Sequence, residues 1–367
     1  MKRLALSLAL LSVALAAYLM FWPVPIEPTR WTAKPSPGYT GVHAANTRLS
    51  NLTVVPLGAD TAPEHIVLHT DGKLYLAVDN GKVLRMKPDG TDQELFATTG
   101  GRVLGFDFDA AGNLIAADAI KGLLAITPAG AVTVLANTVE GDPIRFADAV
   151  VVAANGKVYL TDATTRFSPA DLGLKQASLH DIVEQSGSGR VIEYDPATKA
   201  ARIVVHGLNF ANGIALTRDQ AHLLVVEMAR YRVWKIGVDA DQLDIRQATP
   251  QASVLLDNLP GFPDNLLRGR DGRVWLGLAS PRLALLDDMS DAPALRKLLL
   301  RLPPVMRPPP PPYGHAIAFT DDGTIVEDLQ DPTGAFPEVT GITETDERRY
   351  VQSLNPMGLA WLERTEP

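Results

Sequence analysis

Hydrophobic and polar positions repeat along most of the chain in a single unit. The unit is an apolar strand, a turn centred on glycine, a second strand rich in β-branched and aromatic residues, and another turn. It recurs as EHIVLHTDGKLYLAV from Glu64, LGFDFDAAGNLIAAD from Leu104, DAVVVAANGKVYLTD from Asp148 and DNLLRGRDGRVWLGL from Asp264. The turn glycines Gly72, Gly112 and Gly156 are roughly 40 residues apart, a spacing typical of four-stranded propeller blades.

Further copies of the unit complete a ring. The blades are expected to start at Glu64, Leu104, Asp148, Asn212, Asp264 and Val339. The hairpin from Ala316 is assigned to the outer strands of the fifth blade. Because an open ring would leave a sheet edge exposed, LSNLTVVPL at 49–57 is expected to pair beside the C-terminal strands. The predicted fold is all-β, a six-bladed β-propeller over residues 47–367.

Two insertions interrupt the repeat. The first lies between Asp162 and Gly189 and contains ADLGLKQASLHDIVEQ, whose spacing is compatible with a helix. The second lies between Asp287 and Tyr313, where a helical LRKLLLRL run precedes the proline tract 308–312. Insertions on one face of a propeller often cover a site, so two lid-like insertions are expected.

The N-terminus carries a membrane-targeting pattern. Lys2 and Arg3 precede an apolar run over 4–22, which is long enough to span a bilayer core of about 30 Å. Residues 1–22 are therefore interpreted as a signal anchor or signal peptide. An anchor would place the propeller on the outer, periplasmic or extracytoplasmic, side of the membrane. The stretch 14–16 (ALA) resembles a peptidase site, so a cleaved periplasmic or secreted form is the alternative. Residues 23–46 are expected to be a proline-rich linker.

Charge and composition exclude several kinds of chemistry. The formal net charge is −8, and no dense basic cluster lies beyond the first residues, so nucleic acid is not expected as a partner. The chain has no cysteine, which excludes thiol nucleophiles, disulfides and cysteine-ligated zinc.

Oxygen-bearing side chains recur where the first strands of blades begin, and these strands line the axis of a propeller. The positions are Glu64, Asp148, Asn212, Asp264 and Asn265. Carboxylate and amide oxygens are the ligands that a hard cation such as Ca²⁺ requires. The alternative is that each side chain caps a turn. Since buried carboxylates that converge without a cation are costly, an axial divalent cation, most simply Ca²⁺, is the favoured interpretation.

Several linked motifs resemble a known family. RFADAVVVAANGKVYLTDATTRF, GLNFANGIALTRDQAHLLVVE and GFPDNLLRGRDGRVWLGL are similar to the strictosidine synthase-like family, which is grouped with paraoxonases and gluconolactonases. The resemblance implies six blades around an axial calcium or similar ion. It matches Glu64, Asp148, Asn212 and Asp264 to the metal ligands, with Asn265 following. Asp148 stands where the lactonase relatives usually have asparagine, which keeps an oxygen ligand.

The catalytic residues of the relatives are not retained. The position of the glutamate that drives strictosidine synthesis falls on Thr340, which cannot act as a general acid or base near neutral pH. The stretches LGFDFD and LIAADAIKG lack the histidine pair of paraoxonases. Neither strictosidine synthesis nor paraoxonase chemistry of the usual form is expected.

Simple hydrolysis needs only a cation and a base. Asp264 or Asp118 is the candidate base, and the alternative for Asp118 is a role in a turn or in blade packing. His180, His315 and Tyr313 are the candidate substrate-binding residues at the channel mouth, although each histidine alone is more often structural.

Two functions remain. The first is a metal-dependent hydrolase that takes lactones or related esters as its small-molecule substrates. The alternative is a non-catalytic, membrane-tethered propeller that binds a small molecule or a protein and holds a structural cation.

Overall fold

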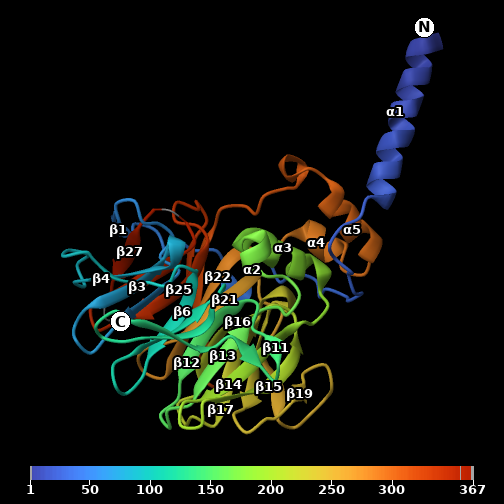
Figure 1. Cartoon of the computed structure of the whole chain (residues 1–367). Coiled ribbons are helices and arrows are strands. Elements are labelled where there is room, and N and C mark those ends of the chain that lie inside the picture. Colours follow the sequence, from blue (N-terminus) through green and yellow to red (C-terminus); the bar gives the residue numbers. More distant parts are fainter. Residues whose placement is uncertain (1, 356, 365–367) are drawn as a thin grey trace.

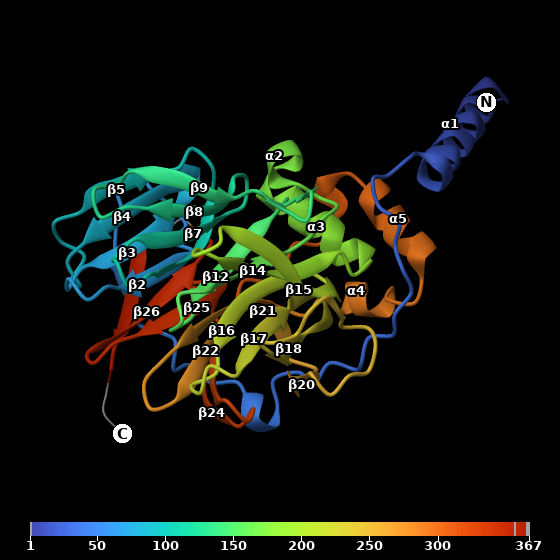
Figure 2. The ribbon, with the colours of Figure 1, turned by 60° about the horizontal axis from the view of Figure 1, so that its bottom comes forward.

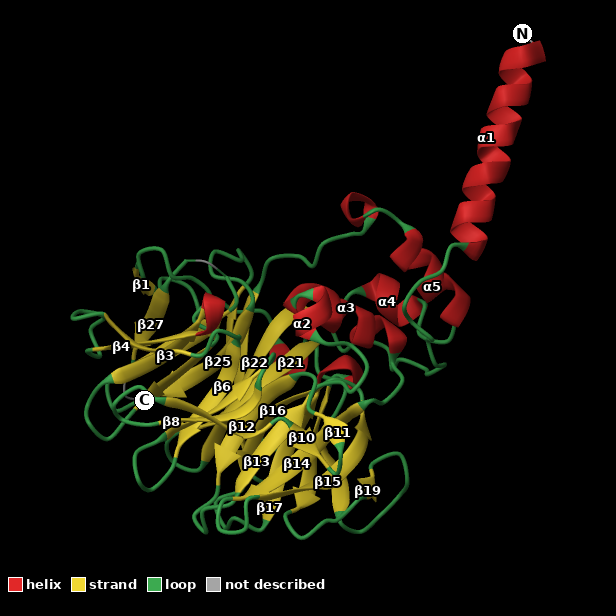
Figure 3. Ribbon diagram, viewed as in Figure 1, coloured by secondary structure: helices red, strands yellow, loops and turns green. Residues whose placement is uncertain are grey.

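A computed structural model describes residues 2–355 and 357–364 of the chain. Six antiparallel sheets are arranged around a central axis, and the helices gather at one side of this body (Figures 1 and 3). The predicted class, an all-β six-bladed propeller with an apolar N-terminal helix, is confirmed.

Each blade is a sheet built mainly from strands that follow one another in the chain, with the first of them innermost. Blades one and two contain β2 (His65–Leu68), β3 (Leu74–Val78), β4 (Lys82–Met86), β5 (Glu94–Thr98), β6 (Val103–Phe108), β7 (Leu114–Asp118), β8 (Gly122–Ile126) and β9 (Val132–Ala136). Blade three contains β12 (Ala147–Val152), β13 (Val158–Asp162), β14 (Gly189–Asp195) and β15 (Ala200–Leu208), and the short β19 (Leu243–Asp244) pairs parallel to β15. A small hairpin, β10 (Thr138–Val139) and β11 (Asp142–Pro143), precedes this blade.

The remaining blades follow the same order. Blade four contains β16 (Ala211–Leu216), β17 (His222–Glu227), β18 (Arg232–Gly237) and β20 (Ala252–Leu256). Blade five contains β21 (Gly261–Arg268), β22 (Arg273–Pro281), β23 (Gly314–Thr320) and β24 (Ile325–Asp331). Blade six contains β25 (Val339–Glu344), β26 (Arg348–Ser353), β27 (Leu359–Glu363) and β1 (Thr53–Val55). The hairpin from Ala316 does supply the outer strands of the fifth blade.

The ring closes by pairing its two ends. Strand β1 runs antiparallel to β27, with Thr53 opposite Trp361 and Val55 opposite Leu359. The last blade therefore combines strands from both ends of the propeller, as expected from the need to cover a sheet edge.

Local turn chemistry explains why the hairpins form where they do. Gly72 and Gly156 have φ of 78° and 85°, a region that favours glycine. In blade four Gln220 takes this position with φ 59°, and the Asp219 carboxylate accepts the Ala221 N–H across the turn. The apolar strand residues then pack between neighbouring blades, and Trp275 is fully buried among them.

Both insertions emerge at the same end of the propeller. Helices α2 (Pro169–Leu172) and α3 (Leu174–Glu184) connect β13 to β14, and α4 (Ala284–Asp288) and α5 (Pro293–Arg301) connect β22 to β23. In each blade the second strand runs antiparallel to the first, so the second strand ends beside the start of the first. In blade three, for example, Ala147 at the start of β12 pairs with Asp162 at the end of β13. The four helices therefore form a lid at the end of the axis where the innermost strands begin (Figure 1).

The N-terminal helix α1 (Lys2–Phe21) projects away from the propeller (Figure 1). By length and composition it is able to cross a membrane, and none of its described residues is buried. Its C-terminal end is fixed to α5, because Arg301 donates hydrogen bonds to the carbonyl oxygens of Trp22 and Leu19 at 2.6 and 3.1 Å.

The segment 23–46, called the strap below, lies against the protein. It runs from α1 past the lid helices and along the outside of the propeller (Figure 2). Ile26 is buried in the core beneath the lid. The Thr29 N–H donates to the Glu184 carbonyl at 2.9 Å, and Arg282 donates to the Lys34 carbonyl at 2.7 Å. The proline-rich linker is therefore docked along its length.

Candidate functional site

The innermost strands share an irregularity where the candidate ligands lie. In blades two to six the pairing between first and second strands shifts at the start of the first strand. A bulge re-aims a side chain and is common beside functional sites. The residues at this shift are Leu104, Asp148, Asn212, Asp264 and Thr340.

Glycine residues directly after the shifted positions are a further sequence signal of the axial site. Gly105, Gly213 and Gly341 each follow a residue of that set. A Cβ on Gly213 would overlap the carbonyl oxygen of Asp264, and one on Gly105 would lie 2.9 Å from the Cα of Ala149. These glycines let neighbouring innermost strands approach closely at the axis.

The structure brings the predicted axial carboxylates together in a buried cluster. Glu64, Asp148, Asn212 and Asp264 are each at most 4% exposed. Burial raises the pKa of Asp264 well above its usual range, and the charges of Glu64 and Asp148 raise it further. Burial and the Glu64 charge likewise raise the pKa of Asp148. The pKa of Glu64 rises to about 7 through burial, opposed by Arg102.

Protein cations compensate only part of this buried negative charge. Arg102 Nη2 lies 3.4 Å from Glu64 Oε2. Among the described residues, Asp148 and Asp264 form no ion pair with a basic side chain. Asp264 Oδ1 and Asn212 Oδ1 are buried without a hydrogen-bond partner. A cluster of carboxylate and amide oxygens with excess negative charge fits a hard divalent cation such as Ca²⁺.

Two neighbours fix the backbone of Glu64. The Thr340 hydroxyl donates to the Glu64 carbonyl oxygen at 2.9 Å, and the Asn265 side-chain amide donates to the same oxygen at 3.3 Å. Thr340 and Asn265 thus join the first blade to the fifth and sixth at the axis. In this arrangement the amide nitrogen of Asn265 is used to position Glu64.

Asp118 has contacts that favour the structural alternative. Its carboxylate accepts the Thr99 hydroxyl at 2.6 Å and the backbone N–H groups of Arg102, Ile120 and Lys121 at 3.0 to 3.1 Å. The same blade position is acidic in the next two blades, where Asp162 accepts the Phe146 N–H and Glu227 accepts the Asn209 N–H. The register pairs Val103–Asp118, Ala147–Asp162 and Ala211–Glu227 are equivalent. Asp118, Asp162 and Glu227 therefore share one structural role, because each carboxylate accepts a backbone N–H from the segment that precedes the first strand of its blade.

We expect Asp118→Ala to destabilise the fold without removing activity. Losing the acceptor of several buried N–H groups is expected to lower the free energy of unfolding by about 2 to 3 kcal/mol. Denaturant unfolding measures this loss, and hydrolysis per folded molecule, assayed well below the transition, is expected to stay near the wild-type value. A folded but inactive variant would instead assign Asp118 to the chemistry.

The three predicted substrate-binding residues lie away from this cluster. His180 is on α3, half-buried, with its ring 5.4 Å from that of Phe167. Tyr313 and His315 lie at the third strand of the fifth blade, in contact with the strap residue Tyr39. Among the described residues, no hydrogen bond or ion pair links any of the three to the axial carboxylates. Their role in substrate binding stays a prediction that these contacts do not support.

An apolar layer covers the cluster on the lid side. Phe146, Phe210 and Phe262, which stand at or near the starts of innermost strands, are buried in one core with residues of α3 and α5. Met228 belongs to this core, and its sulfur lies 4.0 Å from Asn212 Nδ2. The axial cluster is therefore screened from water on this side by aromatic and aliphatic side chains.

A cavity of about 400 Å³ occupies the axis on the opposite side. Its walls come from the innermost strands beyond the cluster, including His65, Phe106 and Leu266. Arg270 and Asp346 are exposed at its outer end. The cluster thus lies between a solvent-facing cavity and the lid.

Solved structures share this architecture. A gluconolactonase from Xanthomonas campestris aligns over 93% of this chain and 98% of its own, with a TM-score of 0.60 at 16% identity. The calcium-binding protein regucalcin from Agrobacterium tumefaciens aligns over 86% of this chain and 98% of its own, with a TM-score of 0.54 at 14% identity. The protein therefore shares its six-bladed propeller fold with these two structures.

Sequence comparison shows which family the chain resembles. The strictosidine synthase profile matches residues 148–240, and the strictosidine synthase-like N-terminal profile matches 41–86. Strictosidine synthase-like protein 6 of Arabidopsis thaliana is 35% identical over 68% of this chain and 65% of its own length. The adipocyte plasma membrane-associated protein of Bos taurus is 29% identical over 92% of this chain and 84% of its own. The chain is therefore similar to the strictosidine synthase-like family, and its match spans just under two thirds of the length of the first Arabidopsis relatives.

Proposed function

We propose that the protein is a metal-dependent hydrolase of lactones or related esters, with its reaction centre at the axial cluster. The observation that carries this proposal is the buried excess of negative charge, together with the unpartnered oxygens of Asp264 and Asn212. A protein core selected for stability alone would not contain these carboxylates, because a buried carboxylate whose charge is not compensated is costly. Several neighbouring carboxyl groups with perturbed pKa values are typical of functional sites.

The residues at the axis serve in this proposal as cation ligands, as a base and as positioning groups. Glu64, Asp148, Asn212 and Asp264 would hold the cation. A bound divalent cation supplies Lewis acidity toward a carbonyl oxygen and lowers the pKa of water. Asp264, which has an oxygen without a hydrogen-bond partner, accepts the proton of the attacking water. Thr340 and Asn265 keep Glu64 in place through its carbonyl oxygen.

The surroundings of the cluster favour substrates with an apolar part. Phe146, Phe210 and Phe262 form the lid-side layer, and their rings offer no group to hydrogen-bond a sugar hydroxyl. A site of this kind selects by apolar contact area. We therefore propose that alkyl or aryl lactones and esters are preferred over sugar lactones such as gluconolactone.

The position of the protein in the cell follows from α1. An apolar helix of 20 residues, with no acidic residue in its first turn and with Lys2 and Arg3 at its start, fits a signal anchor with its N-terminus inside. We propose that the propeller is held at the outer face of the membrane. Relatives described as plasma membrane-associated agree with a membrane location.

A substrate panel tests the proposed function. The full chain in detergent is assayed with alkyl lactones, aryl esters and gluconolactone, with and without chelator. We expect the apolar substrates to be hydrolysed, and we expect the chelator to abolish the hydrolysis. Calcium binding without turnover of any panel member would favour the non-catalytic binding propeller, and turnover that ignores the chelator would contradict the mechanism.

A further inference from the structure

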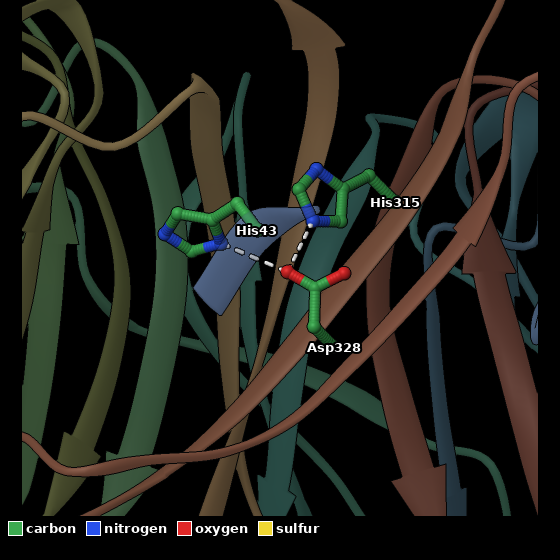
Figure 4. A group of neighbouring side chains, drawn as sticks. All are labelled: His43, His315 and Asp328. Carbon is green, nitrogen blue, oxygen red and sulfur yellow. Dashed lines mark hydrogen bonds and ion pairs between the residues drawn. The ribbon is translucent and has the colours of Figure 1, made fainter. Parts of the chain in front are cut away.

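A second cluster of ligand-type side chains lies between the strap and the fifth blade, outside the axial site. It consists of His43 in the short 3₁₀ helix Gly41–His43, His315 on β23 and Asp328 on β24 (Figure 4). His43 Nδ1 lies 2.8 Å from Asp328 Oδ2, and His315 Nε2 lies 3.1 Å from the same oxygen. One donor atom from each residue lies within 4.8 Å of the other two.

The three side chains are buried and their orientation is fixed by neighbours. His43 and Asp328 are each 7% exposed, and His315 is 1% exposed. Asn46 Nδ2 donates to Asp328 Oδ1 at 3.2 Å, and Gln330 Nε2 contacts that oxygen too. Since these amides occupy Oδ1, Oδ2 faces both imidazoles. Partners that orient a carboxylate ligand in this way are typical of metal centres.

A fourth donor lies close by. The Tyr39 hydroxyl is buried and has no hydrogen-bond partner. The Tyr39 ring stacks on that of Tyr313 with centroids 4.5 Å apart, and its centroid lies 5.7 Å from that of His315. A buried, unpartnered hydroxyl is costly, so its presence on a ring that lies beside His315 requires an explanation.

We propose that His43, His315 and Asp328 bind a divalent transition-metal ion, of which Zn²⁺ fits best, with the Tyr39 hydroxyl as a candidate further ligand. Two imidazole nitrogens and one carboxylate oxygen suit Zn²⁺ and do not suit Ca²⁺, which takes oxygen ligands. Ligand atoms on a tetrahedral zinc ion lie about 3.3 Å apart, given Zn–N bonds of about 2.0 to 2.1 Å. The two separations between an imidazole nitrogen and Asp328 Oδ2, 2.8 and 3.1 Å, are close to this value, and the two nitrogens lie within 4.8 Å of each other.

Such an ion would clamp the strap to the propeller. His43 is 285 residues from Asp328 in the sequence, so the ion would join the segment after the membrane helix to the outer strand of blade five. The alternative is a clasp held by hydrogen bonds alone, in which both imidazoles donate to Asp328 Oδ2. This inference does not depend on the proposed hydrolase activity.

Metal content and spectroscopy distinguish a metal centre from a hydrogen-bonded clasp. The full chain is stripped with chelator, dialysed against Zn²⁺ or Co²⁺ in excess Ca²⁺, and analysed by mass spectrometry for bound metal. We expect one zinc ion per chain, a visible d–d absorption from bound cobalt, and zinc X-ray absorption with imidazole scattering at about 2.0 to 2.1 Å. These readouts on the wild-type chain do not depend on the folding of a variant.

Two variants locate the ion. In His43→Gln/His315→Gln, we expect the zinc and the cobalt absorption to be lost, and we expect the zinc-induced rise in Tm to disappear. In Asp264→Asn, which changes the axial cluster only, all three are expected to persist. Absence of stoichiometric zinc in the wild-type chain, or zinc retained in a folded double variant, would overturn the proposal in favour of the hydrogen-bonded clasp.

Discussion

Asp264→Asn is expected to reduce hydrolysis of apolar lactones by about 10²- to 10⁴-fold, the usual contribution of a positioned general base. The substitution preserves the size of the side chain and removes the charge that neighbours Glu64 and Asp148. It also removes an oxygen donor from the proposed cation site. Steady-state kinetics of the full chain, at saturating Ca²⁺ and below the unfolding transition, measures the loss.

A matched control is available on the innermost strand of another blade. Asp107 on β6 is a half-buried carboxylate whose pKa is also raised by burial, but it accepts the N–H groups of Phe108 and Val152 and faces the cavity beyond the cluster. We expect Asp107→Asn to keep activity within a few-fold of wild type. Equal losses in both variants would indicate a general effect of buried charge and would contradict a special role for Asp264.

Calcium is expected to stabilise the protein strongly at pH 7.5 and weakly near pH 4. In the absence of the ion, the folded pKa of Glu64 is about 7, above the value of about 4.3 in an unfolded chain. A raised folded pKa adds stability below the unfolded pKa, and this stability is lost as pH rises through the folded pKa. As pH rises from about 4.3 to about 7, Glu64 loses its proton, and its oxygens become available to bind Ca²⁺. The stabilisation by calcium therefore increases over the same pH range.

The size of the calcium effect can be stated for a chosen concentration. At a free Ca²⁺ concentration 100 times the Kd, binding adds about 2.7 kcal/mol to the free energy of unfolding. This corresponds to a rise in Tm of roughly 5 °C for a chain of this size. Thermal scans with calcium and with chelator across this pH range measure the difference. A shift that does not depend on pH, or one that persists in Asp264→Asn, would show that calcium binds elsewhere.

Much of the fold was predictable because its signals are local. Glycines with positive φ mark the hairpins, the 40-residue spacing marks the blades, and the exposed edge left by an open ring requires a strand such as 53–55. The same reasoning assigned β23 and β24 to the fifth blade, although the second insertion separates them from β22. These features depend on short-range pattern and on the pairing rules of sheets.

The candidate site was predictable in part. The residue positions Glu64, Asp148, Asn212 and Asp264 follow from the starts of the innermost strands, and the structure gathers them in one buried cluster. The bulges that aim Asp148, Asn212 and Asp264 at the axis are a property of strand pairing and are not visible in the alternation of hydrophobic residues. Asp118 became interpretable only when register placed it opposite Val103, as Asp162 is opposite Ala147.

The strap and its histidine were beyond sequence reasoning for a different reason. His43 meets Asp328 across 285 residues, and nothing in the composition of a proline-rich stretch indicates which surface it covers. His315, expected at the channel mouth, lies instead in this contact because β23 is the third strand of its blade and stands away from the axis. Long-range docking of an irregular segment depends on the finished surface of the propeller.

Restoration of activity by calcium tests the central claim most directly. The full chain is treated with chelator, freed of it, and titrated with Ca²⁺ while hydrolysis of an apolar lactone is recorded. Activity is expected to be absent at the start and to return in proportion to the occupancy of one high-affinity calcium ion per chain. Hydrolysis that is already complete before calcium is added, or that stays absent when calcium is bound, would contradict a metal-dependent hydrolase at the axial cluster.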